Sequence, residues 1–268
     1  MKPICVWGSL LFVVAAVVLA CSPYPGVEEA ADSAEHDTNK SITLSPLTGS
    51  PGYEQAELSL NHFDVDGGGF DFSVQGYELG IQTADAGTNG LANSAKGQHI
   101  HLIVDNGPYS AHYENQAQVD LEPGVHTVMA FLSRSYHESV KAPSAAVLTE
   151  VTVGSEGDQA TDDEGSFDAA APHLFYSRPK GTYVGADTKK LMLDFYLANI
   201  TLSADGYRVI ANVEGQEFVL DTWQPYVIEG LKLGEVTVDL RLVDAGGEMV
   251  PGPYNQVSRT VTLEAAAE

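Results

Sequence analysis

Cysteine is nearly absent from this chain of 268 residues, which contains only Cys5 and Cys21. Cys5 lies in an apolar N-terminal segment that we expect to be cleaved off, and Cys21 follows that segment directly. After cleavage and lipidation the chain would hold no free thiol, which excludes disulfides and cysteine-ligated metal sites. Its stability must then come from side-chain packing.

Basic residues are also scarce, because 13 Lys and Arg stand against 37 Asp and Glu, for a formal net charge of −24. Loss of Lys2 with the N-terminal segment would make the balance 12 − 37 = −25. A surface this acidic repels nucleic acid and anionic lipid head groups. We therefore expect no nucleic-acid partner, and an anionic ligand would need a local basic pocket.

Motifs of catalysis are missing as well. The sequence has no G-x-S-x-G, no H-E-x-x-H and no G-x-x-x-x-G-K, the patterns of serine nucleophiles, zinc proteases and phosphate loops. The stretch 64–71 lacks the terminal Glu of a calcium-binding EF-hand loop, and its glycines favour a turn. We predict a non-enzymatic protein with no catalytic residues and no cofactor, unless histidines bind a metal.

The one long apolar run extends from Ile4 to Ala20, after the positive charge of Lys2. Its seventeen residues are short for a membrane span, and it ends at a cysteine, as bacterial lipoprotein signals do. We predict a signal peptide over 1–20, a lipid (palmitate) on Cys21, and anchoring in the outer membrane of the cell envelope. An ordinary secretory signal or a transmembrane anchor is the alternative.

The sequence contains one module twice. Residues 124–153 align with 234–263 at a constant offset of 110, and ten of the thirty positions are identical. Upstream, 97–107 aligns with 206–216 at an offset of 109. Such a repeat indicates tandem copies of one structural unit. Shared residues then indicate scaffold, and residues present in one copy are candidates for function.

Composition divides the chain around these copies. We predict a flexible acidic tether over 21–50, copy one over 51–153, an acidic linker over 154–171 and copy two over 172–268. Apolar residues alternate with polar ones, as in Val236, Val238, Leu240 and Leu242, which is typical of half-buried strands. Asn106-Gly107 predicts a tight hairpin. We predict an all-β fold of two tandem immunoglobulin-like β-sandwiches.

Five histidines of copy one have no histidine counterpart in copy two, at positions 99, 101, 112, 126 and 137. His99 and His101 are two residues apart on a predicted strand, so their side chains share one face and could chelate a metal. With His112 or His137 they would make a three-nitrogen zinc or copper site. His126 aligns with a valine of copy two, and we predict a core histidine there.

The same alternation predicts an unusual outer face on copy one. Ile100, Leu102 and Val104 are expected in the core. Outward positions on the two neighbouring strands are histidine or apolar: His99, His101, Ile103, Val125, Met129 and Phe131. Exposed, this face would bind a partner such as a peptide or protein; otherwise copy two, the tether or an extra strand covers it.

A second candidate surface is the loop Arg134, Ser135, Tyr136 and His137, which replaces a plain turn in copy two. Binding residues often lie on such loops. Arg178 and Lys180 form a basic pair that could face the loop and bind phosphate or carboxylate. The alternative is a turn whose polar groups bond to one another.

A resemblance rests on three segments, GQHIHLIVDNGPYSAHYE (97–114), FLSRSYHESVK (131–141) and PHLFYSRPKGTYVG (172–185). They resemble a family of bacterial envelope lipoproteins often called phosphopeptide-binding proteins. That resemblance implies binding of a phosphorylated peptide, with the phosphate on Arg134, Arg178 and Lys180.

Copy one is also similar to an uncharacterised His-rich immunoglobulin-like family with the pattern G-x-H-H-H-L-x-x-D and then P-G-x-H-T. Here the pattern is carried by Gly97, His99, His101, Leu102 and Asp105, then by Pro123, Gly124, His126 and Thr127. Ile100 replaces the middle histidine. Three functions stay open: recognition of a peptide or other polar ligand, zinc or copper binding, and a structural spacer.

Overall fold

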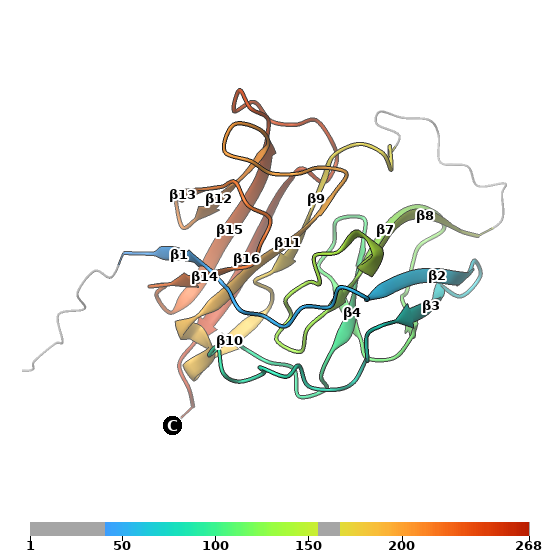
Figure 1. Cartoon of the computed structure of the whole chain (residues 1–268), viewed down its shortest axis with the longest axis horizontal. Helices are drawn as coiled ribbons and strands as arrows, with labels where there is room; N and C mark the ends of the chain where they lie inside the picture. Colours follow the sequence, from blue (N-terminus) through green and yellow to red (C-terminus); the bar gives the residue numbers. More distant parts are fainter. Residues whose placement is uncertain (1–40, 155–166, 268) are drawn as a thin grey trace, which may run out of the picture. The chain divides into compact units, whose positions relative to one another are not determined.

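The computed structural model describes residues 41–154 and 167–267, which lie in one compact unit. The predicted signal peptide, Cys21 and part of the linker fall outside these ranges. Among the residues described, no helix is long and apolar enough to cross a membrane. Nearly all regular structure is β-strand, as expected for an all-β fold (Figure 1).

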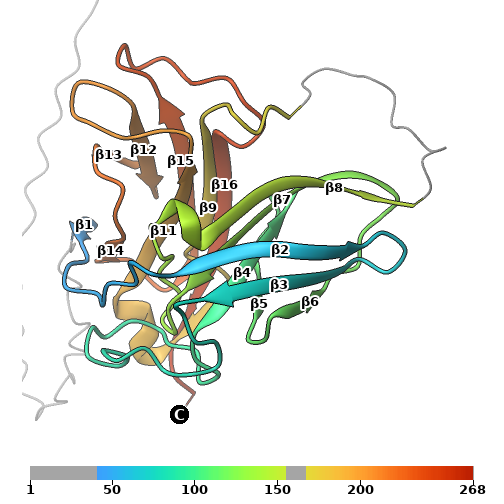
Figure 2. The same ribbon diagram turned by 45° about the vertical axis from the view of Figure 1, so that its right-hand side comes forward.

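The first copy is a sandwich of two antiparallel sheets. One has the order β2-β3-β6 and the other β5-β4-β7-β8 (Figure 2). The strands are β2 (Glu57–Asp64), β3 (Gly69–Gln75), β4 (His99–Val104), β5 (Ser110–His112), β6 (Gln116–Gln118), β7 (Gly124–Ser133) and β8 (Ala146–Val153), with a short 3₁₀ helix η1 (Pro143–Ala145) before β8. This order is that of fibronectin-III and immunoglobulin-like domains. Ile100 and Leu102 lie in its core, as the alternation predicts.

The second copy repeats this arrangement. Its sheets have the orders β1-β14-β11-β9 and β10-β16-β15-β12-β13. The elements are β9 (His173–Arg178), β10 (Thr182–Val184), η2 (Gly185–Lys189), β11 (Leu191–Ala198), β12 (Arg208–Val213), β13 (Gln216–Leu220), β14 (Tyr226–Glu229), β15 (Gly234–Val243) and β16 (Gln256–Glu264). Val236, Val238, Leu240 and Leu242 are all at most 2% exposed. The prediction of two immunoglobulin-like sandwiches is confirmed.

The two copies agree in strand register as well as in sequence. His99 pairs with Ser133 between β4 and β7, and the equivalent Arg208 pairs with Val243 between β12 and β15. The predicted hairpin after β4 exists, but its left-handed residues are Asp105 and Asn106, one position earlier than expected. The Gly107 N–H donates to the Val104 carbonyl at 2.8 Å, which closes a type I′ turn.

Part of the predicted tether is ordered, so that prediction is wrong over four residues. Strand β1 (Thr43–Pro46) pairs antiparallel with β14 of the second sandwich (Figure 1). Ile42 and Leu44 pack against the second core. An edge strand is held largely by backbone hydrogen bonds, which composition does not encode. The chain thus contributes to the second sandwich before it builds the first.

The outer face predicted for copy one is covered by copy two. Ile103, Met129 and Phe131 pack in one cluster with aromatic side chains of the second copy, namely Phe175, Tyr196 and Tyr254. His99 and His101 are fully buried on the same face. Of the alternatives for this surface, coverage by the second copy is the one observed, and only the peripheral Val125 stays exposed.

Candidate metal centre

Three histidine nitrogens converge at the buried face of the first sandwich. His99 and His101 alternate with the core residues Ile100 and Leu102 on β4, so both rings lie on the outer side of the sheet. His137 reaches them from the turn after β7. His99 Nε2 lies 2.8 Å from His101 Nε2 and 3.1 Å from His137 Nδ1. One nitrogen of each ring lies within 4.8 Å of the other two.

Hydrogen bonds on the far side of the rings orient the first two histidines. His99 Nδ1 donates to the Gly97 carbonyl at 2.8 Å, which leaves Nε2 as a lone-pair acceptor. His101 Nδ1 lies 3.2 Å from the Ser177 hydroxyl on β9. The hydroxyl can accept a hydrogen bond from Nδ1–H, which leaves the Nε2 lone pair free for a metal. It can also donate to Nδ1, in which case Nε2 carries the proton and donates to His99 Nε2. Ser177 therefore suits the metal-bound and metal-free states.

Burial keeps all three imidazoles in the neutral form that binds metals. It lowers the pKa of His99 to about 4. It also lowers the pKa values of His101 and His137, and the positive charges of Arg178 and Lys180 lower both further. A neutral imidazole has a free lone pair at neutral pH, so no proton competes strongly with an ion.

His137 is held in a backbone conformation that L-residues avoid. Its φ is +72°, and the equivalent residue of the second copy is Gly247, with φ +86°. The two turns share their hydrogen bonds, from Arg134 N–H to the Glu138 carbonyl and from Asp244 N–H to the Glu248 carbonyl. The first copy therefore has an ordinary turn in which a glycine position carries an imidazole. Such strain is often found at functional sites.

Aromatic rings enclose the triad. Tyr109 stacks on His101 with ring centroids 3.6 Å apart, and its hydroxyl lies 3.4 Å from His137 Nδ1. Phe131 meets the His101 ring edge-on, and Tyr113 packs on His99 at 5.0 Å. Sequence reasoning missed Tyr109. The available signal was its place in the hairpin segment that follows the two histidines.

The other two predicted histidines lie outside the triad. His112 pairs across from Ile100 and its Nε2 lies 2.7 Å from the Ser110 hydroxyl. His126 is half-buried, so the prediction of a core histidine is wrong. Its ring contacts Asp105 Oδ2 at 2.5 Å and the Glu122 carbonyl at 2.7 Å. It lies near the start of β7, before the strand enters the core at Thr127.

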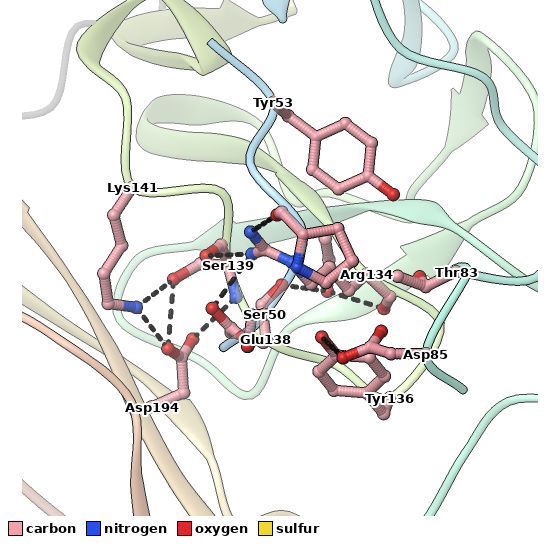
Figure 3. Close-up of polar contacts among 12 residues, drawn as sticks. Ser50, Tyr53, Thr83, Asp85, Arg134, Tyr136, Glu138, Ser139, Lys141 and Asp194 are labelled. Atoms are coloured by element: carbon pink, nitrogen blue, oxygen red, sulfur yellow. Dashed lines mark hydrogen bonds and ion pairs between the residues drawn. The ribbon is translucent and has the colours of Figure 1, made fainter. Parts of the chain in front are cut away.

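The predicted polar-ligand loop is buried and bonded internally. Arg134 is 6% exposed and pairs with Glu138 at 3.0 Å. Ser135 is fully buried, and the Tyr136 hydroxyl donates to Asp85 Oδ2 at 3.2 Å (Figure 3). In this arrangement the loop is part of the interior, which contradicts its prediction as an open ligand surface. The shared Glu138 and Glu248 were a signal that the turn is scaffold.

The predicted basic pair has internal partners too. Arg178 is 8% exposed and donates to the Tyr183 hydroxyl at 2.9 Å. Lys180 Nζ donates to the Tyr109 carbonyl at 2.5 Å. The sequence thus correctly predicted that these cations lie near the histidine loop, but they contact tyrosines.

A buried carboxylate joins the two sandwiches beside this loop. Asp194 on β11 is fully buried and accepts bonds from Ser139 N–H at 3.2 Å, Ser139 Oγ at 3.1 Å and Lys141 Nζ at 2.5 Å (Figure 3). Sequence reasoning did not identify it. The signal was a single acid within the apolar run LMLDFYLA.

Comparison with known proteins identifies no family and gives only weak structural similarity. No family model matches the chain, and no curated protein matches it, so the resemblance to envelope lipoproteins stays a prediction. Among solved structures, it is similar to fibronectin(III)-like modules of Clostridium thermocellum CbhA, at 14% identity and a TM-score of 0.28 over 35% of this chain and 99% of that one.

Two further structures are similar at lower scores. One is the Bacteroides ovatus mixed-linkage glucan utilization locus protein SGBP-B in complex with a heptasaccharide, at 11% identity, TM-score 0.20, over 77% of this chain and 47% of that one. The other is the two tandem V-type regions of VCBP3, a v-region-containing chitin binding protein, at 9% identity, TM-score 0.20, over 83% and 99%. With identities this low, function has to be argued from the site itself.

Proposed function

We propose that this protein is a non-enzymatic, lipid-anchored envelope protein that binds one zinc or copper ion through His99, His101 and His137. The observation that carries the proposal is the convergence of three neutral imidazole nitrogens in a buried place. The lipid anchor on Cys21 is proposed from the sequence pattern alone.

The nitrogen spacing fits an ion. A metal about 2.0–2.1 Å from each nitrogen in tetrahedral geometry sets N–N separations of roughly 3.3–3.4 Å. The separations of 2.8 and 3.1 Å from His99 Nε2 are slightly shorter, and all three nitrogens lie within 4.8 Å of one another. Rotation of the side chains would bring the three separations toward the value that an ion sets.

Burial supports binding rather than catalysis. Catalytic zinc keeps a coordination position open to substrate, whereas His99 and His101 are both fully buried. Recognition of a phosphorylated peptide gains no comparable support, because Arg134 and Arg178 already have internal partners. A closed site of this kind is typical of structural metal binding.

The test is metal titration of the full chain, purified in detergent without a histidine tag. We expect one equivalent of Zn²⁺ or Cu²⁺ to bind and to raise Tm, because an ion that binds only the folded state stabilises it by mass action. Competition with a chromophoric chelator gives affinity and stoichiometry.

Paired variants make this test specific. His99→Ala and His101→Ala should each lose the bound equivalent. His112→Ala, which removes a nearby histidine outside the triad, should keep it. Absence of binding at one equivalent in the unsubstituted chain would refute the proposed function.

A further inference from the structure

Building on the proposed function, we infer that Tyr109 is the fourth ligand of the metal centre and coordinates the ion through its phenolate oxygen. The centre would then be a three-histidine, one-tyrosinate site for an ion of charge two or more. The inference rests on the position of the hydroxyl beside His137 and on the charges around it.

The Tyr109 hydroxyl already lies at the edge of the nitrogen triad. Its oxygen is 3.4 Å from His137 Nδ1, which is close to the separation that two ligands of one tetrahedral ion adopt, roughly 3.3–3.4 Å. The ring is 4% exposed and stacks nearly parallel on His101, at an interplanar angle of 16°. Because stacked rings lie in separate planes, the Tyr109 ring would turn on binding to bring its oxygen to an ion held in the plane of the His101 imidazole.

The charges around the site favour an anionic ligand. The three imidazoles are neutral, and within the described part of the chain no carboxylate belongs to the cluster. Lys180 Nζ and the Arg178 guanidinium carbon lie 4.4 and 5.5 Å from the centre of the Tyr109 ring. A buried divalent ion would add positive charge to this cationic surrounding, and burying uncompensated charge is costly. A phenolate would supply one negative charge, which offsets part of the charge of the ion.

The coordination step is balanced without an oxidant or a reductant. The oxygen–hydrogen bond of Tyr109 breaks, its proton goes to solvent, and the oxygen lone pair forms the bond to the ion. Metal binding commonly releases protons from its ligands in this way. Burial raises the pKa of the Tyr109 hydroxyl and the positive charge of Arg178 lowers it only in part, so the metal-free phenol keeps its proton and the ion has to displace it.

Tyr113 provides a matched control. Its ring packs on His99 with centroids 5.0 Å apart, yet its hydroxyl bonds to Ser94 Oγ at 2.7 Å. Tyr113→Phe therefore removes a hydroxyl from the same aromatic surround without removing a proposed ligand.

The experiment uses Cu²⁺, because a phenolate bound to Cu²⁺ produces a charge-transfer band in the visible and phenolate vibrations in the resonance Raman spectrum. The copper-loaded full chain should show both signals. Tyr109→Phe should still bind one equivalent through the histidines, with at least tenfold weaker affinity and without the band. Tyr113→Phe should retain the band and the affinity.

The outcomes separate the two proposals. Bound copper without phenolate signals in the unsubstituted chain would overturn the Tyr109 ligand while leaving the histidine site intact, and would assign the fourth position to water or an external anion. An unchanged band in Tyr109→Phe would also overturn it. No copper binding at all would refute the proposed function itself. If Tyr109→Phe does not fold, the Raman spectra of the unsubstituted protein and of Tyr113→Phe together still decide.

Discussion

At the scale of single residues, the clearest difference between the copies is the backbone position shared by His137 and Gly247. The turn around them is the same, so the imidazole of His137 occupies a backbone position that prefers glycine. A left-handed conformation costs a non-glycine residue on the order of 1–3 kcal/mol. Proteins retain such strain where the side chain has a function, and a role of His137 as a metal ligand would account for it.

A pair of substitutions tests the strain. His137→Gly should be more stable in the metal-free state than His137→Ala, by about 1 kcal/mol, because glycine adopts φ +72° freely and alanine does not. Urea unfolding of both metal-free variants measures the difference. Both variants should lose the metal, since both lack the ring. Equal stabilities, or a more stable alanine variant, would contradict a strained turn at this position.

At the scale of elements, alternation predicted which side chains of β4 face the core and which face outward. It placed His99 and His101 on one face, as observed. It left His112 and His137 as equal candidates for the third ligand, because that choice depends on where a turn 38 residues from His99 folds back. The hydrogen bonds of Asp194 could not be predicted from the sequence either, because their donors belong to the other sandwich.

The ion pair between Lys141 and Asp194 predicts that substitution of the lysine lowers the free energy of unfolding more than substitution of the aspartate. Lys141→Met leaves a fully buried carboxylate with fewer donors and should cost about 3–5 kcal/mol. Asp194→Asn should cost less, because the amide oxygen still accepts from Ser139 N–H and Lys141 can reach solvent. Denaturant unfolding of both single variants and the double variant gives the coupling. A larger cost for Asp194→Asn would argue against a charged, buried Asp194.

At the scale of the whole molecule, the two sandwiches share a buried aromatic cluster, and β1, which precedes the first sandwich in the sequence, belongs to the second. The repeat predicted two modules, but no pattern showed that β1 would join the second sandwich or that Phe175, Tyr196 and Tyr254 would cover the first. Such pairings join residues far apart in sequence, and periodicity reports only local geometry. The sequence therefore predicted the architecture of each module better than the association between them.

This shared core predicts that the two sandwiches unfold together. Calorimetry of the intact chain should give one transition whose calorimetric and van't Hoff enthalpies agree. Phe175→Ala should lower the free energy of unfolding by about 3–5 kcal/mol, because it opens a cavity between the modules. Val219→Ala, at a side chain that is 61% exposed, is the control and should change little. Two separate transitions in the unsubstituted chain would show that the modules unfold independently.

The matched register of the two sandwiches has a consequence for how this centre could arise. Arg208, Ile210 and Gly247 occupy, in the second copy, the backbone positions that His99, His101 and His137 occupy in the first. The histidines therefore occupy backbone positions that the module has with or without them, so gathering them needs no fold of its own. The copy that lacks the histidines packs over the face of the copy that holds them.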